Sequence, residues 1–542
     1  RPLGSVQVGL YAKGLSTHVK PAVNVKVLDK VQDPSRANHI AVYDPILKLS
    51  FTYQQLDQYS NHIAREFIQR NLHNKTASIG CLNHSPLTFT LSMLATWKIG
   101  KVFVPLSISH SVNELSYFIQ DSSMGAVVCF NKDDLATDKW AALGAGTLIE
   151  LESIVKSHQD RLVKESVRLH SGSDALVLYT SGTTGQPKGV VHTHDSIEHI
   201  IKSLIEAWQY NEKDKILHFL PLYHMHGLLN KLLCMLWAGG NVEFLASAKA
   251  KVIWHRLAQE AATLATNPQP VSLFMAVPTV YAKMLEYSKT MNAEEKEAGI
   301  KAMKHMRLMV CGSAALPDPV MDNWYTLTGQ RLLERYGMTE LGMALSNPYQ
   351  GERRKGAVGF PLPYVNVRLV DEQGHVIDKT NTPGELQVMG KTVFKRYLNK
   401  PEATRDTFDG NWFKTGDIAE VSDDGYYKIL GRNSTDIIKS AGYKISALEI
   451  EREILSYPKV LEVAVVGLKH DELGEMVAAI IALREEYRED SKVNEIQKEL
   501  DEHLSDKLAK YKTPRKYYVV NALPRNHLGK VNKKSIIKDL NL

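Results

Sequence analysis

The run from Tyr179 to Gly189 has the side chains needed to hold a chain of phosphates. It directly follows an apolar stretch at 175–178, which predicts a buried strand at 175–180. Glycines let backbone N–H groups approach phosphate oxygens, hydroxyls donate to those oxygens, and the lysine supplies charge. The spacing is not the GxxxxGK[ST] pattern of a P-loop. The run therefore predicts a different polyphosphate-binding loop, with these candidate ligands: Thr180, Ser181, Gly182, Thr183, Thr184, Gly185, Gln186, Pro187 and Lys188.

Five further sequence motifs follow this loop, and together they resemble those of a known family. They are Glu334-Arg335-Tyr336-Gly337-Met338-Thr339-Glu340, Pro383-Gly384-Glu385-Leu386, Trp412-Phe413-Lys414-Thr415-Gly416-Asp417, Gly431-Arg432 with Asp436-Ile437-Ile438-Lys439, and Pro524-Arg525-Asn526-His527-Leu528-Gly529-Lys530. In this order they resemble the adenylate-forming superfamily of acyl-CoA synthetases, adenylation domains of peptide synthetases and luciferases. The resemblance covers nearly the whole chain. It implies ATP and coenzyme A as co-substrates, together with Mg²⁺.

The resemblance gives three residues a part in the attack of a carboxylate on the α-phosphate of ATP. Because both reactants are anions, this step needs cations and oriented donors more than proton transfer. Glu340 would hold Mg²⁺, Thr339 would donate to the α-phosphate, and Lys530 would reach the carboxylate and the α-phosphate. The competing interpretations are a solvated turn carboxylate for Glu340 and a solvated surface lysine for Lys530.

The resemblance also implies contacts with the nucleoside and with coenzyme A. Tyr336 would offer a flat face to adenine, Asp417 would accept hydrogen bonds from the ribose hydroxyls, and Arg432 would contact ribose or phosphate. A core aromatic and a turn aspartate are the structural alternatives for the first two. The other positions implied to bind nucleotide or coenzyme are Ser313, Glu334, Arg335 and Gly442, the last of which would line a pantetheine tunnel.

Arg307 is the candidate for choosing the acid. It directly precedes an apolar run, 308–310, that predicts a buried strand. A fixed guanidinium at the pocket edge would bind a second carboxylate through two hydrogen bonds. The alternative is an arginine in a surface position or a salt bridge. His224 would close over the acyl site, unless it is simply a packed histidine.

The stretches 221–228, 274–279 and 307–317, with the block at 333–340, resemble malonyl-CoA synthetases. That subfamily implies ligation of malonate, or of methylmalonate, to coenzyme A through an acyl-adenylate. Three alternatives stay open: a medium-chain or aryl acyl-CoA synthetase, a stand-alone enzyme that loads a carrier protein, and a catalytically inactive scaffold.

The elements that would position these residues alternate between strand and helix. Apolar runs and amphipathic stretches follow each other from Thr76 to Phe130 and again after Asp174, which predicts βαβ units and parallel sheets. Short strands separated by turns follow Gly356. The expected fold is α/β: a large N-terminal portion, 29–432, with helix-covered parallel sheets and a small β-barrel, and a small mobile α+β domain, 433–542.

Composition narrows the class of protein further. The 542 residues are 44% hydrophobic and 23% charged, which is ordinary for a globular protein and excludes collagen-like, disordered and disulfide-scaffold classes. The net charge of +6 comes without a block of Lys or Arg, so nucleic acid is not an expected partner. Apolar runs are too short to predict a membrane span. The cysteines are widely separated and predict free, buried thiols: Cys81, Cys129, Cys234 and Cys311.

Residues 1–28 contain basic and hydroxyl side chains but no acid. Such a leader resembles the remnant of an organellar transit peptide and favours the mitochondrial matrix, with a cytoplasmic location otherwise. A short basic tail, or an expression remnant at 1–5, is the alternative.

Overall fold

The computed structural model describes residues 25–83, 85–131, 147–152, 174–180, 186–488, 493–525 and 531–542. Of the candidate site residues, Ser181, Gly182, Thr183, Thr184, Gly185 and Lys530 lie outside these ranges.

A sheet of nine strands forms the centre of the N-terminal portion, in the order β15-β14-β13-β12-β11-β9-β10-β1-β2. Neighbours from β13 to β1 run parallel. Strands β10, β11 and β12 are buried at every residue, as expected where helices cover both faces of a parallel sheet. The bounds are β1 (Ile40–Asp44), β2 (Leu49–Thr52), β9 (Lys215–His218), β10 (Asn241–Phe244), β11 (Leu273–Ala276), β12 (Leu308–Cys311), β13 (Leu333–Met338), β14 (Gly342–Ser346) and β15 (Phe360–Pro361).

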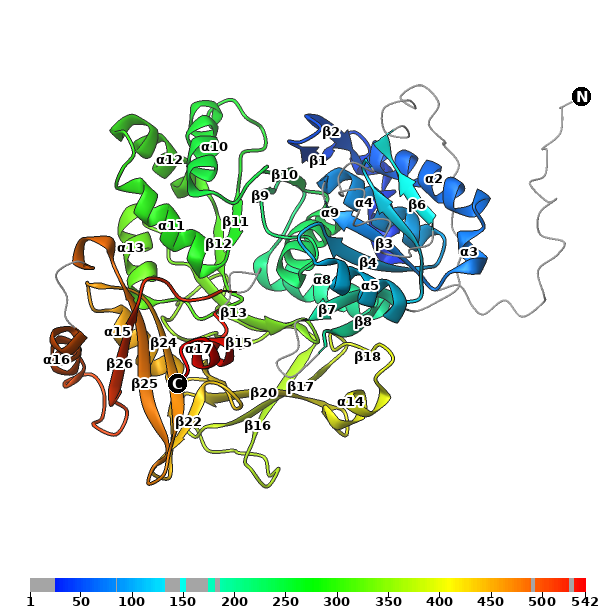
Figure 1. Cartoon of the computed structure of the whole chain (residues 1–542). Coiled ribbons are helices and arrows are strands. Elements are labelled where there is room, and N and C mark those ends of the chain that lie inside the picture. Colours follow the sequence, from blue (N-terminus) through cyan, green and yellow to red (C-terminus); the bar gives the residue numbers. More distant parts are fainter. Residues whose placement is uncertain are drawn as a thin grey trace, which may run out of the picture.

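A second sheet has seven strands in the order β18-β8-β7-β4-β3-β5-β6, with β7 and β8 forming an antiparallel hairpin. Its bounds are β3 (Ser78–Asn83), β4 (Val102–Ser107), β5 (Met124–Cys129), β6 (Thr147–Glu150), β7 (Asp174–Thr180), β8 (Lys188–Thr193) and β18 (Arg396–Tyr397). Figure 1 shows both sheets among blue, cyan and green helices.

Several helices of the N-terminal portion begin at residues whose side chains cap them. Thr52, Ser111 and Thr193 each form a capping box with the residue three positions on. The helices are α1 (Lys26–Val31), η1 (Pro34–Arg36), α2 (Tyr53–Gln69), α3 (Leu72–Lys75), α4 (Pro86–Lys98), α5 (Val112–Asp121), α8 (His194–Trp208), η3 (His226–Leu233), α9 (Cys234–Ala238), α10 (Ala250–Thr263), α11 (Pro278–Ser288), α12 (Ala293–His305), α13 (Asp318–Thr328) and α14 (Pro401–Asp406).

An antiparallel sheet follows in the order β16-β17-β20-β19, with β21 paired to β20. It is the barrel-like module expected after Gly356. Its strands are β16 (Val365–Val370), β17 (Gly384–Gly390), β19 (Phe408–Asp409), β20 (Trp412–Val421) and β21 (Tyr427–Arg432).

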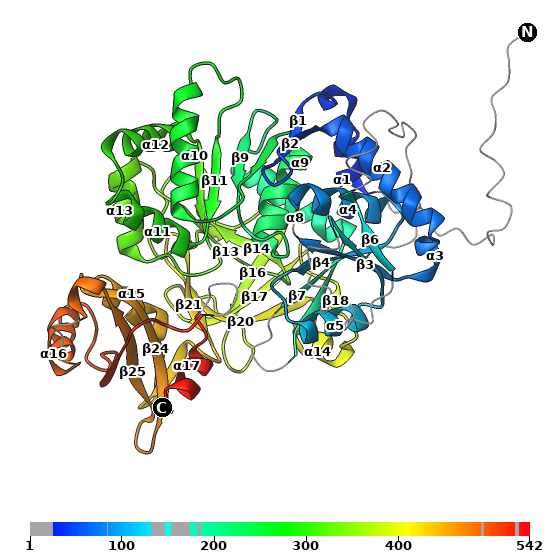
Figure 2. The same cartoon turned by 45° about the horizontal axis from the view of Figure 1, so that its top comes forward.

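The C-terminal elements build a sheet of their own, in the order β23-β22-β25-β24 with β26 paired to β25. Two apolar clusters made of residues from Ile438 onward fill its faces. In Figures 1 and 2 these orange and red elements lie below the green helices α11 and α13. They are β22 (Ile437–Ser440), β23 (Tyr443–Ser446), α15 (Ala447–Leu455), β24 (Val460–His470), β25 (Gly474–Leu483), η4 (Glu485–Tyr487), α16 (Val493–Leu504), β26 (Lys516–Val520) and α17 (Lys533–Asp539).

The α/β fold expected from the sequence is confirmed, with one local correction. The apolar pattern at 227–237 predicts one regular helix, whereas the chain forms a π-helix, η3, that continues into the short helix α9.

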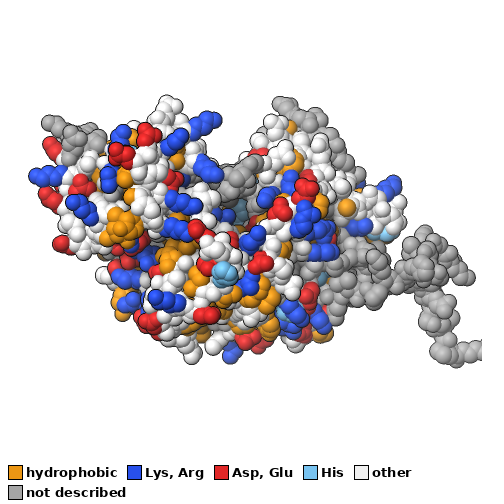
Figure 3. Space-filling model, turned by 90° about the horizontal axis from the view of Figure 1, so that it is seen from below, with side chains coloured by type: hydrophobic (Ala, Val, Ile, Leu, Met, Phe, Trp, Pro, Cys, Tyr) orange, Lys and Arg blue, Asp and Glu red, His pale blue; other side chains and the backbone are white. Residues whose placement is uncertain are grey.

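The four cysteines are free and buried. Within the described ranges, no helix is long and apolar enough to cross a membrane. Positive and negative side chains are interspersed on the face in Figure 3.

Candidate active site

Several of the predicted site residues lie where parallel strands of the nine-strand sheet end. Ser313 lies just beyond the C-terminal end of β12, and Thr339 and Glu340 follow β13. Ligands of open α/β sheets bind at this edge, because the loops that leave the strands meet there. The topology therefore brings segments separated by more than a hundred residues to one place.

The phosphate loop is held at both ends by the β7–β8 hairpin. Thr180 ends β7 and Lys188 begins β8, and the two residues are paired in register. The Lys188 ammonium lies 4.8 Å from the centre of the Tyr397 ring. Pro187 O accepts a hydrogen bond of 2.9 Å from the Tyr117 hydroxyl, which fixes the exit of the loop. Gln186 is exposed.

The Glu340 carboxylate lies buried beside the same hairpin. It accepts a hydrogen bond of 2.9 Å from the Tyr397 hydroxyl. Burial raises the pKa of Glu340, while Tyr397, Arg432 and Lys188 favour its charged form. Tyr397 could not be predicted from any motif, and it joins Glu340 to Lys188 through its hydroxyl and its ring.

His192 positions the residue next to Glu340. One of its ring nitrogens lies 2.7 Å from Thr339 O. Burial lowers the pKa of His192 to about 4, so the ring is neutral at pH 7. A neutral imidazole that donates to this carbonyl fixes the Thr339–Glu340 turn against β8.

Tyr336, Asp417 and Arg432 meet as the sequence predicts for a nucleoside site. The Tyr336 hydroxyl donates to Asp417 Oδ2 over 2.5 Å, and Arg432 Nε lies 3.1 Å from Asp417 Oδ1. Asp417 and Arg432 are also paired in register across β20 and β21. Burial raises the pKa of Asp417, whereas Arg432 favours its ionised form. Each carboxylate oxygen has a second lone pair, so both can still accept from a ribose.

Arg307 does not lie at the pocket edge, and this prediction is wrong. It precedes β12 and therefore lies at the amino end of the strand, opposite the site. Its guanidinium binds both oxygens of Asp214, over 2.7 and 2.6 Å. It also donates to Trp208 O and Gln209 O. With every part of the fork engaged in the protein, Arg307 is a structural salt-bridge residue.

Arg335 is the guanidinium that lies at the site. It is 4% exposed, and its Nη2 donates to Ser313 Oγ over 3.3 Å. A Cβ built on Gly312 would lie 2.7 Å from the guanidinium, so only glycine leaves room for it. Burial lowers the pKa of Arg335 to about 10, and the groups that favour its charge are Cys311 and Tyr210, neither of which is a carboxylate. Arg335 Nε has no hydrogen-bond partner among the described residues.

His226 completes this group. Its Nδ1 lies 3.4 Å from Ser313 Oγ, and burial lowers its pKa well below 6.5. His224, the histidine predicted to close the acyl site, is half-buried with its ring 4.5 Å from that of Tyr223. Its role stays a prediction. His226 follows His224 by two residues, and this repeated histidine was the one feature of the sequence that could have drawn attention to it.

Comparisons with known proteins agree with this geometry. The family model described as "AMP-binding enzyme" matches residues 30–398, and that described as "AMP-binding enzyme C-terminal domain" matches residues 449–530. The chain belongs to the AMP-binding enzyme family. The resemblance seen in the sequence is thereby confirmed.

Three relatives of this AMP-binding enzyme are informative. "Malonate--CoA ligase ACSF3, mitochondrial" of Bos taurus is 39% identical over 523 residues, covering 90% of this chain and 86% of that protein. ATP-bound MatB from Rhodopseudomonas palustris is 31% identical with a TM-score of 0.81, covering 96% of this chain and 99% of that one. A malonyl-CoA ligase ternary product complex with methylmalonyl-CoA and AMP bound is 32% identical with a TM-score of 0.65, covering 93% and 100%.

Glu334 of this AMP-binding enzyme faces the C-terminal elements. Its Oε1 accepts a hydrogen bond of 3.2 Å from Gly356 N. Burial raises the pKa of Glu334 to about 8, although Arg452 of α15 favours its charged form. Arg452 Nε also lies 3.4 Å from Asp318 Oδ1. The contacts of Glu334 point to the junction with α15. Its predicted contact with nucleotide stays a prediction.

Gly442 lies in the turn between β22 and β23. It has a φ of +82° and follows Ala441 with a φ of +49°, so the turn needs left-handed backbone at two successive residues. Its predicted place in a pantetheine tunnel stays a prediction.

The residues around Glu340 suit a magnesium ion held mainly by a substrate. The described ranges contain no cluster of three or more His, Cys, Asp or Glu side chains that could hold a metal. Mg²⁺ is commonly bound by one or two carboxylates together with phosphate oxygens and water. One buried carboxylate beside a phosphate loop fits that pattern.

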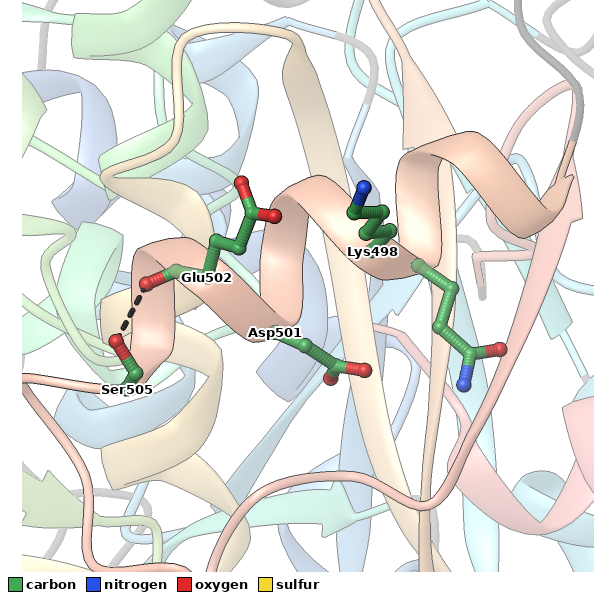
Figure 4. Close-up of a pocket in the computed structure, with 5 residues that line it drawn as sticks. Lys498, Asp501, Glu502 and Ser505 are labelled. Carbon is green, nitrogen blue, oxygen red and sulfur yellow. Dashed lines mark hydrogen bonds between the residues drawn. The ribbon is translucent and has the colours of Figure 1, made fainter.

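A hollow of about 560 Å³ lies elsewhere, along the outer face of α16. Figure 4 shows Lys498, Asp501, Glu502 and Ser505 around one side of this helix. The Ser505 hydroxyl donates to Glu502 O over 2.7 Å, a contact within the end of the helix. These residues share no contact with the candidate active site in the described structure.

Proposed function

We propose that this AMP-binding enzyme is an AMP-forming malonate–CoA ligase. Malonate and ATP give malonyl-adenylate and pyrophosphate, and coenzyme A then displaces AMP to give malonyl-CoA. The observation that carries the choice of acid is the buried Arg335 guanidinium, which lies beside Ser313 and has no carboxylate partner among the residues that the structure describes. The names of the bovine relative and of the ternary product complex support the same substrate class.

In the adenylation step, the protein would surround the reacting anions with positive charge and donors. Lys188 and the loop residues Thr180 to Pro187 would hold the β- and γ-phosphates at the end of the β7–β8 hairpin. Thr339, positioned by His192, would donate to the α-phosphate. Lys530 would neutralise charge between the carboxylate and the α-phosphate. Glu340 would hold Mg²⁺, which would supply positive charge beside the phosphates.

The nucleoside would bind at the end of β13 and along β20. Tyr336 would stack on adenine, and its hydroxyl, which donates to Asp417, would orient that carboxylate toward the ribose. Arg432 holds the other oxygen of Asp417 and lies where β21 ends. The Asp417 carboxylate would thus bind the ribose and also hold Arg432 at the end of β21.

The distal carboxylate of malonate would bind Arg335, with Ser313 and His226 as neighbours. A guanidinium can form two parallel hydrogen bonds to a carboxylate, which fixes both the position and the plane of the acid. This would hold the proximal carboxylate at a constant distance from the α-phosphate. Methylmalonate has the same pair of carboxylates and belongs to the same substrate class.

Thioester formation would use a different placement of the C-terminal domain, 433–542, against the N-terminal domain, 29–432. Gly442 would then line the path of the pantetheine arm.

Residues 1–28 would direct the protein to the mitochondrial matrix. The description of the bovine relative as mitochondrial supports this location. Small molecules, namely malonate, ATP and coenzyme A, are the proposed partners.

The proposed function is tested by measuring pyrophosphate release from ATP with a panel of single acids. The panel contains malonate, methylmalonate, succinate, butyrate, octanoate and benzoate, each with and without coenzyme A. We expect kcat/KM to be highest for malonate or methylmalonate. A preference for octanoate or benzoate would instead indicate an acyl-CoA synthetase for medium-chain or aryl acids.

A further inference from the structure

Lys231 is a fully buried lysine on the π-helix η3, and nothing in the proposed mechanism uses it so far. It has no exposed surface. Its Nζ donates to Met275 O over 3.0 Å and lies 4.5 Å from the centre of the Phe219 ring. Phe219 directly follows β9, and Met275 is the penultimate residue of β11. The amine therefore lies at the C-terminal edge of the sheet, where the active-site residues gather.

Lys231 and the Arg335 guanidinium lie along the same C-terminal edge of the sheet. Strands β9 and β11 pair at only two positions, and the Lys231 amine binds the β11 backbone just beyond them. Strand β12 is the next neighbour of β11, and Gly312, which contacts Arg335, directly follows β12. Neighbouring strands are about 5 Å apart. His226 is near both: it and Arg335 share Ser313 Oγ as a neighbour, it precedes Lys231 by five residues on η3, and the charge of each cation lowers its pKa.

No described acid balances these two cations. Neither the Lys231 amine nor the Arg335 guanidinium is paired with a carboxylate in the described ranges, and burial lowers both pKa values. The same region holds five buried polar atoms without a hydrogen-bond partner among the described residues: His218 Nδ1, His226 Nε2, Asn230 Nδ2, Asn230 Oδ1 and Arg335 Nε. Leaving buried polar groups unsatisfied costs free energy. Such a cluster is suited to receive an anionic ligand.

We propose that Lys231 is a specificity-determining residue of the acyl site. Together with Arg335, it binds the distal carboxylate of a short dicarboxylic acid. The inference rests on the proposed function and adds a second cation to its acid-binding group. A monocarboxylic acid would place an alkyl end against two buried cations, so both cations select against it. A carboxylate at the same position would accept hydrogen bonds from both.

A purely structural role is the competing explanation, because Lys231 also caps Met275 O. Replacing the lysine would then harm the fold and lower activity with every acid alike. Lys98 provides a matched control for that effect. It is equally buried, but its Nζ is paired with Asp57 and with Asn61, each at 2.7 Å, on helix α2.

The test compares Lys231→Met, Lys231→Gln and Lys98→Met with the unaltered full-length enzyme. The glutamine variant keeps a donor for Met275 O while removing the charge. Pyrophosphate release is measured with malonate and with butyrate, and thermal unfolding reports on the fold. Hydrogen bonds to charged groups contribute about 1.5–3 kcal/mol each, so we expect the KM for malonate to rise roughly 10- to 100-fold in both Lys231 variants.

The ratio of kcat/KM for malonate to kcat/KM for butyrate separates a specificity role of Lys231 from a purely structural one. We expect kcat/KM for butyrate not to fall in the Lys231 variants, and to rise roughly several-fold in Lys231→Met, because the alkyl end then no longer faces a buried amine. The Lys98 variant should unfold at a lower temperature and keep the ratio of malonate to butyrate. An unchanged ratio in both Lys231 variants would overturn this inference and leave the ligase function standing. An unaltered enzyme that prefers butyrate would overturn the proposed function as well.

Discussion

At the scale of single residues, the two arginines at 307 and 335 have opposite roles because their surroundings differ. Arg307 meets a buried aspartate with ideal bidentate geometry, so its charge is already used within the protein. Arg335 is more deeply buried and has no carboxylate partner in the described structure. Of the two arginines, Arg335 is therefore the one whose guanidinium is available to bind a carboxylate of a ligand.

The first prediction compares substitutions at these two arginines. Arg335→Met should lower kcat/KM for malonate roughly 100-fold, since a charge-assisted bidentate contact is lost. Butyrate, which has no distal carboxylate, should be affected much less. Pyrophosphate release with each acid measures both values.

Arg307→Met should act on stability instead. It leaves the buried Asp214 without its partner and should cost about 2–4 kcal/mol in the free energy of unfolding. The ratio of malonate to butyrate activity should stay the same, as measured by denaturant unfolding together with the same kinetic assay. A loss of activity with malonate but not with butyrate in this variant would show that Arg307 binds the acid after all.

The second prediction concerns pH and the buried histidines His192 and His194. Burial lowers the pKa of each to about 4, whereas an unfolded histidine titrates near 6.5. Between these values the unfolded chain binds more protons than the folded one, so stability falls as pH falls from about 6.5 to 4. His192→Gln should make the unfolding free energy less dependent on pH in that window, by up to about 1.4 kcal/mol per pH unit. An identical slope in the variant would show that His192 is not buried in its neutral form.

At the scale of elements, strand direction explains what the sequence could and could not predict. The blocks at 179–189, 334–340 and 412–417 identified strands β7, β13 and β20 and the turns beyond them, because a chemically unusual run follows an apolar one. Arg307 was misplaced because it precedes its strand and so lies at the end away from the site. Periodicity finds a strand such as β12 without showing which end faces the ligand.

The same limit applies to η3. Its apolar pattern predicts a helix, but a π-helix shifts each side chain relative to a regular one, so Lys231 and His226 could not be placed from spacing. Tyr397 and His192 act through contacts with distant residues, and such contacts leave no local pattern. The side chains proposed to touch the nucleotide were more predictable than the side chains that hold them in place.

The third prediction concerns the end of β12. Gly312→Ala adds a Cβ that would lie 2.7 Å from the Arg335 guanidinium, so the guanidinium must move. We expect the KM for malonate to rise on the order of tenfold, while the affinity for ATP changes little because Asp417 and Tyr336 are untouched. Steady-state kinetics with each substrate varied in turn measures the two effects. Gly374→Ala is the control for a glycine substitution far from the site. Its added Cβ meets no atom within 4 Å, but its φ of +85° disfavours alanine, so it should lower stability without raising the KM for malonate.

At the scale of the whole molecule, the C-terminal part rests on the N-terminal part through a small set of charges. Arg452 reaches the Asp318 carboxylate and the buried Glu334, and a Cβ on Gly356 would lie 2.6 Å from its guanidinium. Lys444 adds an ion pair of 2.6 Å with Glu372. The TM-score is higher against the ATP-bound MatB structure than against the product complex, at similar sequence identity. The arrangement thus resembles the ATP-bound form more closely.

The fourth prediction follows from that arrangement. Arg452→Ala should weaken the contact by on the order of 1 kcal/mol, which corresponds to roughly fivefold slower adenylation. Thioester formation from supplied malonyl-adenylate should be affected less, because it would use another placement of the domain. Separate assays of the two half-reactions measure this. Arg484→Ala, which removes a longer contact of 3.8 Å to Glu286, is the control. Equal slowing of both half-reactions would contradict the role of Arg452 as a contact of the adenylation state.

The central claim is that this enzyme joins a short dicarboxylic acid to coenzyme A. The most direct test is mass measurement of the CoA thioesters formed from ATP, coenzyme A and an equimolar mixture of malonate, methylmalonate, succinate, butyrate and benzoate. We predict that malonyl-CoA or methylmalonyl-CoA is the main product, formed together with one AMP per thioester. Butyryl-CoA or benzoyl-CoA as the main product would contradict the assignment.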